Sequence, residues 1–158
     1  MKRTAWLILI LLSANPAARA GDVEDVEAAA QLWLQTIGRH DPDAMVALYD
    51  EDAVLLGTTS PILRHGPQAI REYFAQAALV PDLRMQFDGP MNIRVFGDIG
   101  INSGFYSVSL TENGATRTIP LRYSFVYRKR DGSWKIINHH SSTLPAQNPT
   151  PQREKGES

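Results

Sequence analysis

The spacing of apolar side chains divides the sequence into a helical first part and a β-rich second part. After Asp22, apolar residues recur every three or four positions, which predicts a helix with one buried face that ends at Gly38. The stripe consists of Val26, Ala30, Trp33, Leu34 and Ile37. Asp41 and Pro42 are typical of an N-cap and a first helical residue, so we expect a second helix from there to Tyr49.

A short strand and a third helix are expected next. The acidic residues 50–52 are interpreted as a solvated loop, followed by a short apolar strand at residues 53–56. His65 and the Gly-Pro pair after it are typical of a helix start, and this helix should end before Pro81. Its apolar face would consist of Ile70, Tyr73, Phe74 and Ala77.

From residue 85 onward the apolar residues follow a period of two, which predicts long antiparallel strands. The first of these, at residues 85–95, contains Gly89-Pro90 and should be kinked there. In the strand at residues 99–110 the apolar positions change parity between Ile101 and Tyr106. We therefore expect a β-bulge near Ser103-Gly104.

Two hairpin signals flank the following strand. Asn113-Gly114 and Asp131-Gly132 both suit tight turns with positive φ. Between them, Tyr123, Phe125 and Tyr127 share one face of a strand. The order of elements predicts an α+β fold, in which a cone-shaped, bent antiparallel sheet packs against three helices and leaves a cavity inside the cone.

The last strand carries the strongest candidates for chemistry, His139 and His140. Adjacent strand residues point to opposite faces, so the two cannot act on one site. A two-residue turn at Asp131-Gly132 would pair Tyr123 with His140, whereas a three-residue loop would pair Tyr123 with His139. The spacing of Trp134 and Ile136 favours the first arrangement, so sequence reasoning leaves both histidines as candidates.

Composition restricts where this domain works and what it binds. Lys2-Arg3, an apolar run and Ala18-Arg19-Ala20 form a secretory signal peptide at residues 1–20, so we expect an exported, periplasmic or secreted protein that begins at Gly21. The apolar run is too short to span a membrane. Cleavage would leave 13 basic and 17 acidic side chains, a formal charge of −4, which disfavours nucleic acid as a partner.

Several kinds of active site lack support in the sequence. Cysteine is absent, so disulfides, thiolate metal sites and cysteine nucleophiles are excluded. Neither metal-ligand spacing nor a dinucleotide-binding motif is present, and we expect no metal and no cofactor. The segment after Pro145 (residues 146–158) has little to bury and is expected to be a disordered tail, which leaves residues 21–145 as the domain.

The closing motif resembles the nuclear transport factor 2-like superfamily. The residues that carry the resemblance are Arg130-Asp131-Gly132-Ser133-Trp134 with Ile137, His139, His140, Ser142 and Pro145, together with Val95-Phe96-Gly97-Asp98 and the helix start at His65-Gly66. They are most similar to the association domain of calcium/calmodulin-dependent protein kinase II and to small bacterial relatives called SgcJ/EcaC-like. The resemblance implies a cone-shaped domain that self-associates through its sheet and holds a small molecule.

The same resemblance suggests which residues line the cavity. Where the kinase domain has arginines, this sequence has Ser107, Phe125 and Ser141, and an inward Ser141 would also turn His139 inward. Tyr49, Tyr123, Asp50 and His65 are candidate polar partners of that histidine, although no spacing in the sequence forces them together. A small, largely apolar ligand fits such a lining better than an anion does. An isomerase- or cyclase-type enzyme with His139 or His140 as general acid–base, and a pure oligomerisation module, are the alternatives.

Overall fold

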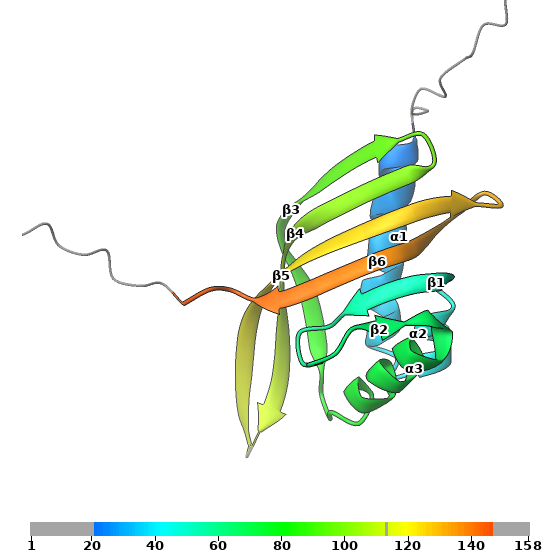
Figure 1. Cartoon of the computed structure of the whole chain (residues 1–158). Coiled ribbons are helices and arrows are strands. Elements are labelled where there is room, and N and C mark those ends of the chain that lie inside the picture. Colours follow the sequence, from blue (N-terminus) through cyan, green and yellow to red (C-terminus); the bar gives the residue numbers. More distant parts are fainter. Residues whose placement is uncertain (1–20, 113, 147–158) are drawn as a thin grey trace, which may run out of the picture.

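The computed structural model describes residues 21–112 and 114–146 (Figure 1). The expected signal peptide, and the expected tail apart from Ala146, lie outside this range. Within it, three helices pack against a single sheet of six strands that does not close into a barrel. The expected α+β class is confirmed.

The three helices begin where capping residues and prolines suggest. Helix α1 (Asp22–Ile37) buries the stripe that includes Val26, Ala30 and Trp33. Helix α2 (Pro42–Val46) is capped by Asp41, whose Oδ1 accepts hydrogen bonds of 3.0 Å from two backbone amides. Helix α3 (Gly66–Ala77) follows His65 and buries Ile70 and Phe74. These starts confirm the sequence interpretation.

The sheet is mixed, with the strand order β2-β1-β6-β5-β4-β3. Its strands are β1 (Tyr49–Leu56), β2 (Arg64–His65), β3 (Arg84–Phe96), β4 (Ile99–Glu112), β5 (Ala115–Arg130) and β6 (Ser133–Thr143). The meander from β3 to β6 is antiparallel as expected, but β1 lies parallel to β6. The residues that pair here are 84 to 87 positions apart in the sequence, which is why local patterning did not predict the parallel pair.

The start of β1 corrects two expectations. Tyr49 does not end a helix, and residues 50–52 do not form a loop. This segment is the start of β1, which pairs with β6 in the sheet. The backbone N–H of Ile136 donates to the carbonyl of Leu48 at 3.0 Å. The side chain of Asp50 is 1% exposed, and its Oδ1 lies 3.4 Å from Nη1 of Arg130. Strand pairing therefore overrides the polar composition of the segment.

Strand β4 also differs from expectation. Its pairing with β5 is regular from Ile99 to Glu112, so no bulge lies at Ser103-Gly104. The register shifts instead in the partner strand β3, between Asp88 and Asn92, where the Gly89-Pro90 kink was expected. The alternation in β4 is unbroken, and it buries Gly100 and Asn102 while Ile101 faces outward.

Position 100 of β4 faces inward, and a glycine occupies it because helix α1 packs directly against the strand there. Helix α1 crosses one face of the sheet, while α2 and α3 lie beside β1 and β2 (Figure 1). A Cβ atom at Gly100 would lie 2.7 Å from Cγ2 of Val26 and 3.4 Å from the ring of Trp134. The glycine thus permits the close approach of α1.

Among the described residues, no helix is both long and apolar enough to cross a membrane.

Gly100→Ala should therefore destabilise the fold. The added methyl group would push α1 away from β4, and overpacking of this kind lowers the free energy of unfolding by about 1–3 kcal/mol. Chemical denaturation monitored by tryptophan fluorescence measures the change. Gly38→Ala is the matched control, because its Cβ would meet only a backbone oxygen at 3.6 Å. Equal stability of the two variants would contradict the packing argument.

Candidate functional site

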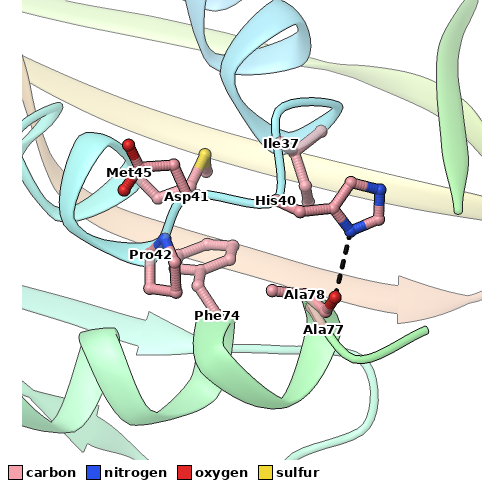
Figure 2. A pocket seen from close by; sticks show the side chains of 8 residues that line it. All are labelled: Ile37, His40, Asp41, Pro42, Met45, Phe74, Ala77 and Ala78. Atoms are coloured by element: carbon pink, nitrogen blue, oxygen red, sulfur yellow. Dashed lines mark hydrogen bonds between the residues drawn. The ribbon is translucent and has the colours of Figure 1, made fainter. Parts of the chain in front are cut away.

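Two hollows lie against the helices, and the smaller one is structural. Figure 2 shows it between the turn after α1, the start of α2 and the end of α3. Nδ1 of His40 lies 3.1 Å from the backbone oxygen of Ala78, which connects the turn to α3. Its volume is about 10 Å³, enough for roughly one water molecule. This crevice has no room for an organic ligand.

The larger hollow is a cavity of about 470 Å³ between the concave face of the sheet, α1, α3 and the segment after β1. A volume of this size lies within the range of small-molecule sites. Its apolar lining consists of Trp33, Ile37, Phe74, Ala77, Val80, Leu83, Met85, Val108, Leu110, Ile119 and Leu121. Its polar lining consists of Thr58, Thr59, Ser60, Arg64, Tyr73, Gln76, Tyr106, His139, Ser141 and Thr143.

The register of β6 brings His139 to this cavity. The turn at Asp131-Gly132 has two residues, because Arg130 pairs with Ser133. Taken alone, that turn would place His140 inward. The register then shifts, so that Tyr127 pairs with Ile136 and Val126 with Asn138, which leaves Ile137 as an extra residue.

Because of this β-bulge, the turn has two residues and His139 nevertheless points inward, which combines features of the two arrangements that the sequence left open. Trp134 and Ile136 point inward before the bulge, and His139 and Ser141 point inward after it. Tyr123 pairs with Ser141 rather than with either histidine, and His139 pairs with Phe125. His140 is exposed on the opposite face of the sheet.

His139 is hydrogen-bonded to Tyr49 of β1, which is itself hydrogen-bonded to Trp33 of α1. Its Nδ1 lies 2.8 Å from the hydroxyl oxygen of Tyr49. The same hydroxyl accepts a hydrogen bond of 3.0 Å from Nε1 of Trp33. The imidazole is 2% exposed, and its centroid lies 4.3 Å from that of Phe125 and 5.4 Å from the indole of Trp33.

The surroundings of His139 disfavour its charged form. Burial, and secondarily the neighbouring His140, lower the pKa of His139 from its ordinary value of 6.5 to about 3. The imidazole is therefore neutral at neutral pH. Burial also raises the pKa of Tyr49 well above its ordinary value, so this hydroxyl stays protonated as well.

A second polar group lies next to His139 on β6. The hydroxyl of Tyr106 donates to Oγ of Ser141 at 2.5 Å, and Oγ of Ser141 is also hydrogen-bonded to the hydroxyl of Thr58. Burial raises the pKa of Tyr106 well above its ordinary range. The cavity wall thus combines a neutral imidazole with three neutral hydroxyl groups.

Charge is sparse around the cavity. Arg64 is the one formally charged side chain among the lining residues that the structure describes. Its Nη1 lies 3.6 Å from a carboxylate oxygen of Glu72, and its Nε donates to Ser60 at 3.3 Å. Over residues 21–112 and 114–146, no three His, Asp or Glu side chains form a group that could hold a metal ion.

Comparison with known proteins identifies the family. The sequence matches the model of the SnoaL-like domain over residues 26–147. The chain belongs to the SnoaL-like family. It matches no curated protein.

Solved structures show that this SnoaL-like domain has the fold of the nuclear transport factor 2-like superfamily, as expected from the sequence. A crystal structure from Xanthomonas campestris, named "Putative calcium/calmodulin dependent protein kinase II association domain", is 32% identical, covers 87% of this chain and 99% of its own, and gives a TM-score of 0.74. Two others support the fold alone. A ketosteroid isomerase-like protein from Erwinia carotovora atroseptica is 22% identical, covers 78% of this chain and 97% of its own, and gives a TM-score of 0.66. A nuclear transport factor 2 (NTF2-like) superfamily protein from Salmonella enterica is 18% identical, covers 85% of this chain and 96% of its own, and gives a TM-score of 0.71.

The SnoaL-like domain brings together some of the expected site residues and separates others. His139 and Ser141 line the cavity, and Tyr49 contacts His139 from behind the cavity wall. Tyr123 and Phe125 share the inward face but are buried in the core without lining the cavity. Burial raises the pKa of Tyr123 to about 12, while its hydroxyl donates to the side-chain oxygen of Asn102 at 3.2 Å.

Ser107 does not lie where the sequence analysis expected it. It is an odd-numbered residue of β4, while the inward positions are even-numbered, and its hydroxyl donates to Asp88 at 3.2 Å. Ser107 is therefore on the opposite face from the cavity, which corrects its expected place in the lining.

Sequence reasoning missed several lining residues. The periodicity predicts Trp33 only as part of the buried face of α1, whereas its indole also lines the cavity and donates a hydrogen bond to the Tyr49 hydroxyl. Tyr106, Val108 and Leu110 alternate along β4, and this signal could have assigned them to the same inward face. Thr58 lies in an irregular segment after β1, and no periodicity predicts its position.

His139 should make stability depend on pH. In the unfolded chain a histidine binds a proton below about pH 6.5, whereas folded His139 stays neutral down to a pKa of about 3. The unfolded state binds more protons in this window, so the free energy of unfolding falls as pH drops through it. His139→Phe should weaken this dependence by up to about 1 kcal/mol per pH unit.

Urea denaturation at about pH 7 and about pH 5 tests this expectation. The slope with pH is the readout, because the substitution also changes stability at every pH. His140→Phe, on the exposed face, is the matched control and should keep the slope of the parent protein. An unchanged slope in His139→Phe would contradict the buried, neutral state of this imidazole.

Proposed function

We propose that this protein binds a small, largely apolar molecule in the cavity between the sheet and helices α1 and α3. The observation that carries the proposal is a volume of about 470 Å³ whose walls combine a large apolar part with several polar side chains. Sites of this kind bury most of a ligand's surface and use a few polar contacts to orient it. Burial of apolar area would supply most of the binding free energy.

The charge distribution supports a neutral ligand. Arg64 at the cavity is already engaged by Glu72 and Ser60. His139 is uncharged because of its lowered pKa. A carboxylate or phosphate inside the cavity would lose its hydration without gaining a free cation, which is costly in an apolar environment.

An enzyme of the isomerase or cyclase type is the second candidate. The relative named as ketosteroid isomerase-like shares the fold, but its identity is too low to transfer an activity. General acid–base catalysis works best with a pKa near the working pH. The pKa of about 3 at His139 makes it a weak base and leaves it without an acidic proton of useful strength, so binding is the better-supported function.

A substitution that fills the cavity should abolish binding. Val108 lines the cavity from β4, so Val108→Trp adds a large side chain to the space that the ligand would occupy. We expect the parent protein to bind N-phenyl-1-naphthylamine, a neutral apolar dye, with increased fluorescence. The variant should bind it at least about tenfold more weakly, since the buried apolar area is lost.

Ser109→Trp is the matched control for this experiment. Ser109 lies between two lining residues, Val108 and Leu110, and therefore faces the other side of the sheet. The control should keep the parent affinity and the parent fold by circular dichroism. If the parent protein fails to bind the dye, or if both variants bind it equally, the cavity is not the binding site.

We also propose that the outer face of the sheet mediates self-association. An apolar strip runs over its strands and consists of Phe96, Ile99, Ile101, Phe105 and Val126. Phe96 is 60% exposed and Phe105 is 54% exposed. Exposed and half-buried apolar side chains gathered in this way are typical of interaction surfaces. The relative from Xanthomonas campestris, which is named as an association domain, supports the same interpretation.

Phe105→Glu should dissociate the oligomer. The substitution places a charge at one end of the apolar strip, where its burial in an interface would be unfavourable. Size-exclusion chromatography with light scattering should find a dimer or larger species for the parent and a monomer for the variant. Thr116→Glu, an exposed position toward the β4–β5 hairpin, is the control. A monomeric parent protein would refute self-association.

A further inference from the structure

We infer that the ligand presents a neutral hydrogen-bond acceptor, such as a ketone or ester carbonyl oxygen, to Nε2–H of His139. The inference rests on the proposed binding function and specifies the chemistry of the ligand's polar end. It follows from the order of donors and acceptors along three buried side chains.

The hydrogen-bond chain begins with a residue that can only donate. Nε1 of Trp33 carries a hydrogen and has no accepting lone pair, so the Tyr49 oxygen accepts this bond. The single hydroxyl hydrogen of Tyr49 is then directed to its other partner, Nδ1 of His139, at 2.8 Å. Nδ1 is consequently the acceptor in this bond.

The tautomer of His139 follows from this order. A neutral imidazole has one N–H and one bare nitrogen, and Nδ1 is the bare one. Nε2 therefore carries the hydrogen. Over the described part of the chain, Nε2 is covered by neighbouring side chains and has no hydrogen-bond partner, while His139 as a residue lines the cavity, so a ligand would reach this donor by displacing the side chains that cover it. An unsatisfied buried donor costs about 1–3 kcal/mol, so an acceptor supplied by a ligand would relieve a cost that the empty protein bears.

The neighbouring hydroxyl groups add a second donor. Tyr106, Ser141 and Thr58 have three hydroxyl hydrogens, and the two hydrogen bonds among them use two. One hydrogen is left over, whichever way the bond between Ser141 and Thr58 runs. Ser141 lies two residues from His139 on the same face of β6. The wall thus offers donors, which suits a carbonyl oxygen with its two lone pairs.

The anion alternative is weaker on the same observations. An N–H donor would also suit a carboxylate, but the four donor and hydroxyl side chains here are neutral and the nearby Arg64 is paired. The aromatic rings around His139 exclude water, which raises the cost of burying a charge. The geometry therefore favours an uncharged acceptor.

Three matched probes test the inference by calorimetry or fluorescence quenching. They are 2-acetylnaphthalene, which has a carbonyl acceptor, 2-ethylnaphthalene, which lacks it, and 2-naphthoate, which is charged. In the parent protein the ketone should bind more tightly than the carboxylate. In His139→Phe, the ketone should lose about threefold to tenfold in affinity relative to 2-ethylnaphthalene, because one neutral hydrogen bond is removed.

The outcomes separate this inference from the proposed function. If 2-ethylnaphthalene and the ketone both bind but their ratio is unchanged in His139→Phe, the inference is wrong and the apolar-binding function stands. Tighter binding of 2-naphthoate than of the ketone would also overturn the inference. If none of the probes binds, the proposed function fails and the inference fails with it.

Nitrogen-15 NMR of the histidine rings provides a test that needs no ligand and no variant of His139. The parent protein should show Nε2 of His139 protonated and Nδ1 bare. Tyr49→Phe removes the donor that fixes this tautomer and should shift the ring toward a mixture of tautomers. A proton on Nδ1 in the parent protein would overturn the inference, because Nε2 would then be an acceptor.

Discussion

The site depends on one extra residue in β6. A strand that alternates without interruption from Trp134 would turn Ile136, Asn138 and His140 inward. The bulge at Ile137 resets the alternation, so the apolar anchors and the polar pair His139 and Ser141 occupy the same face. The first part of the strand can thus pack against α1 while the second part lines the cavity. A tight two-residue turn and an inward His139 are compatible only because of this shift.

The bulge brings His139 into an aromatic environment that fixes its chemistry. Trp33 from α1 and Tyr49 from β1 reach it from elements that are far apart in the sequence. Desolvation keeps the imidazole neutral, and the hydrogen bond from Tyr49 orients it. The ring is therefore held as a positioned donor rather than as a titrating base. Burial that would spoil an acid–base catalyst is compatible with a recognition group, since hydrogen bonds gain strength in a low dielectric.

How far the sequence predicts this molecule depends on the range of the determining interaction. Helix starts at Asp41 and His65 and the kink at Gly89-Pro90 are local signals, and they were predicted correctly. The strand at Tyr49 depends on pairing with β6, and the buried position of Asn102 is accompanied by a hydrogen bond from Tyr123, so periodicity alone misassigned both segments. Periodicity alone also did not predict the bulge at Ile137, because the bulge depends on how β6 pairs with β5. The resemblance to relatives correctly favoured His139 over His140 as the inward residue.

The unpaired Nε2 of His139 and the cavity beside it both lower the stability of the fold, so their presence needs an explanation. A phenylalanine or leucine at position 139 would satisfy the aromatic pocket without leaving a buried donor unpaired, and such replacements of buried polar groups are often neutral or stabilising. A cavity of about 470 Å³ beside the same ring forgoes packing contacts as well. Both features lower stability in the empty protein, and both would be compensated by one apolar molecule with an acceptor at its inner end. The proposed binding of an apolar ligand with an acceptor thus accounts for both the unpaired donor and the cavity beside His139, which folding alone would not favour.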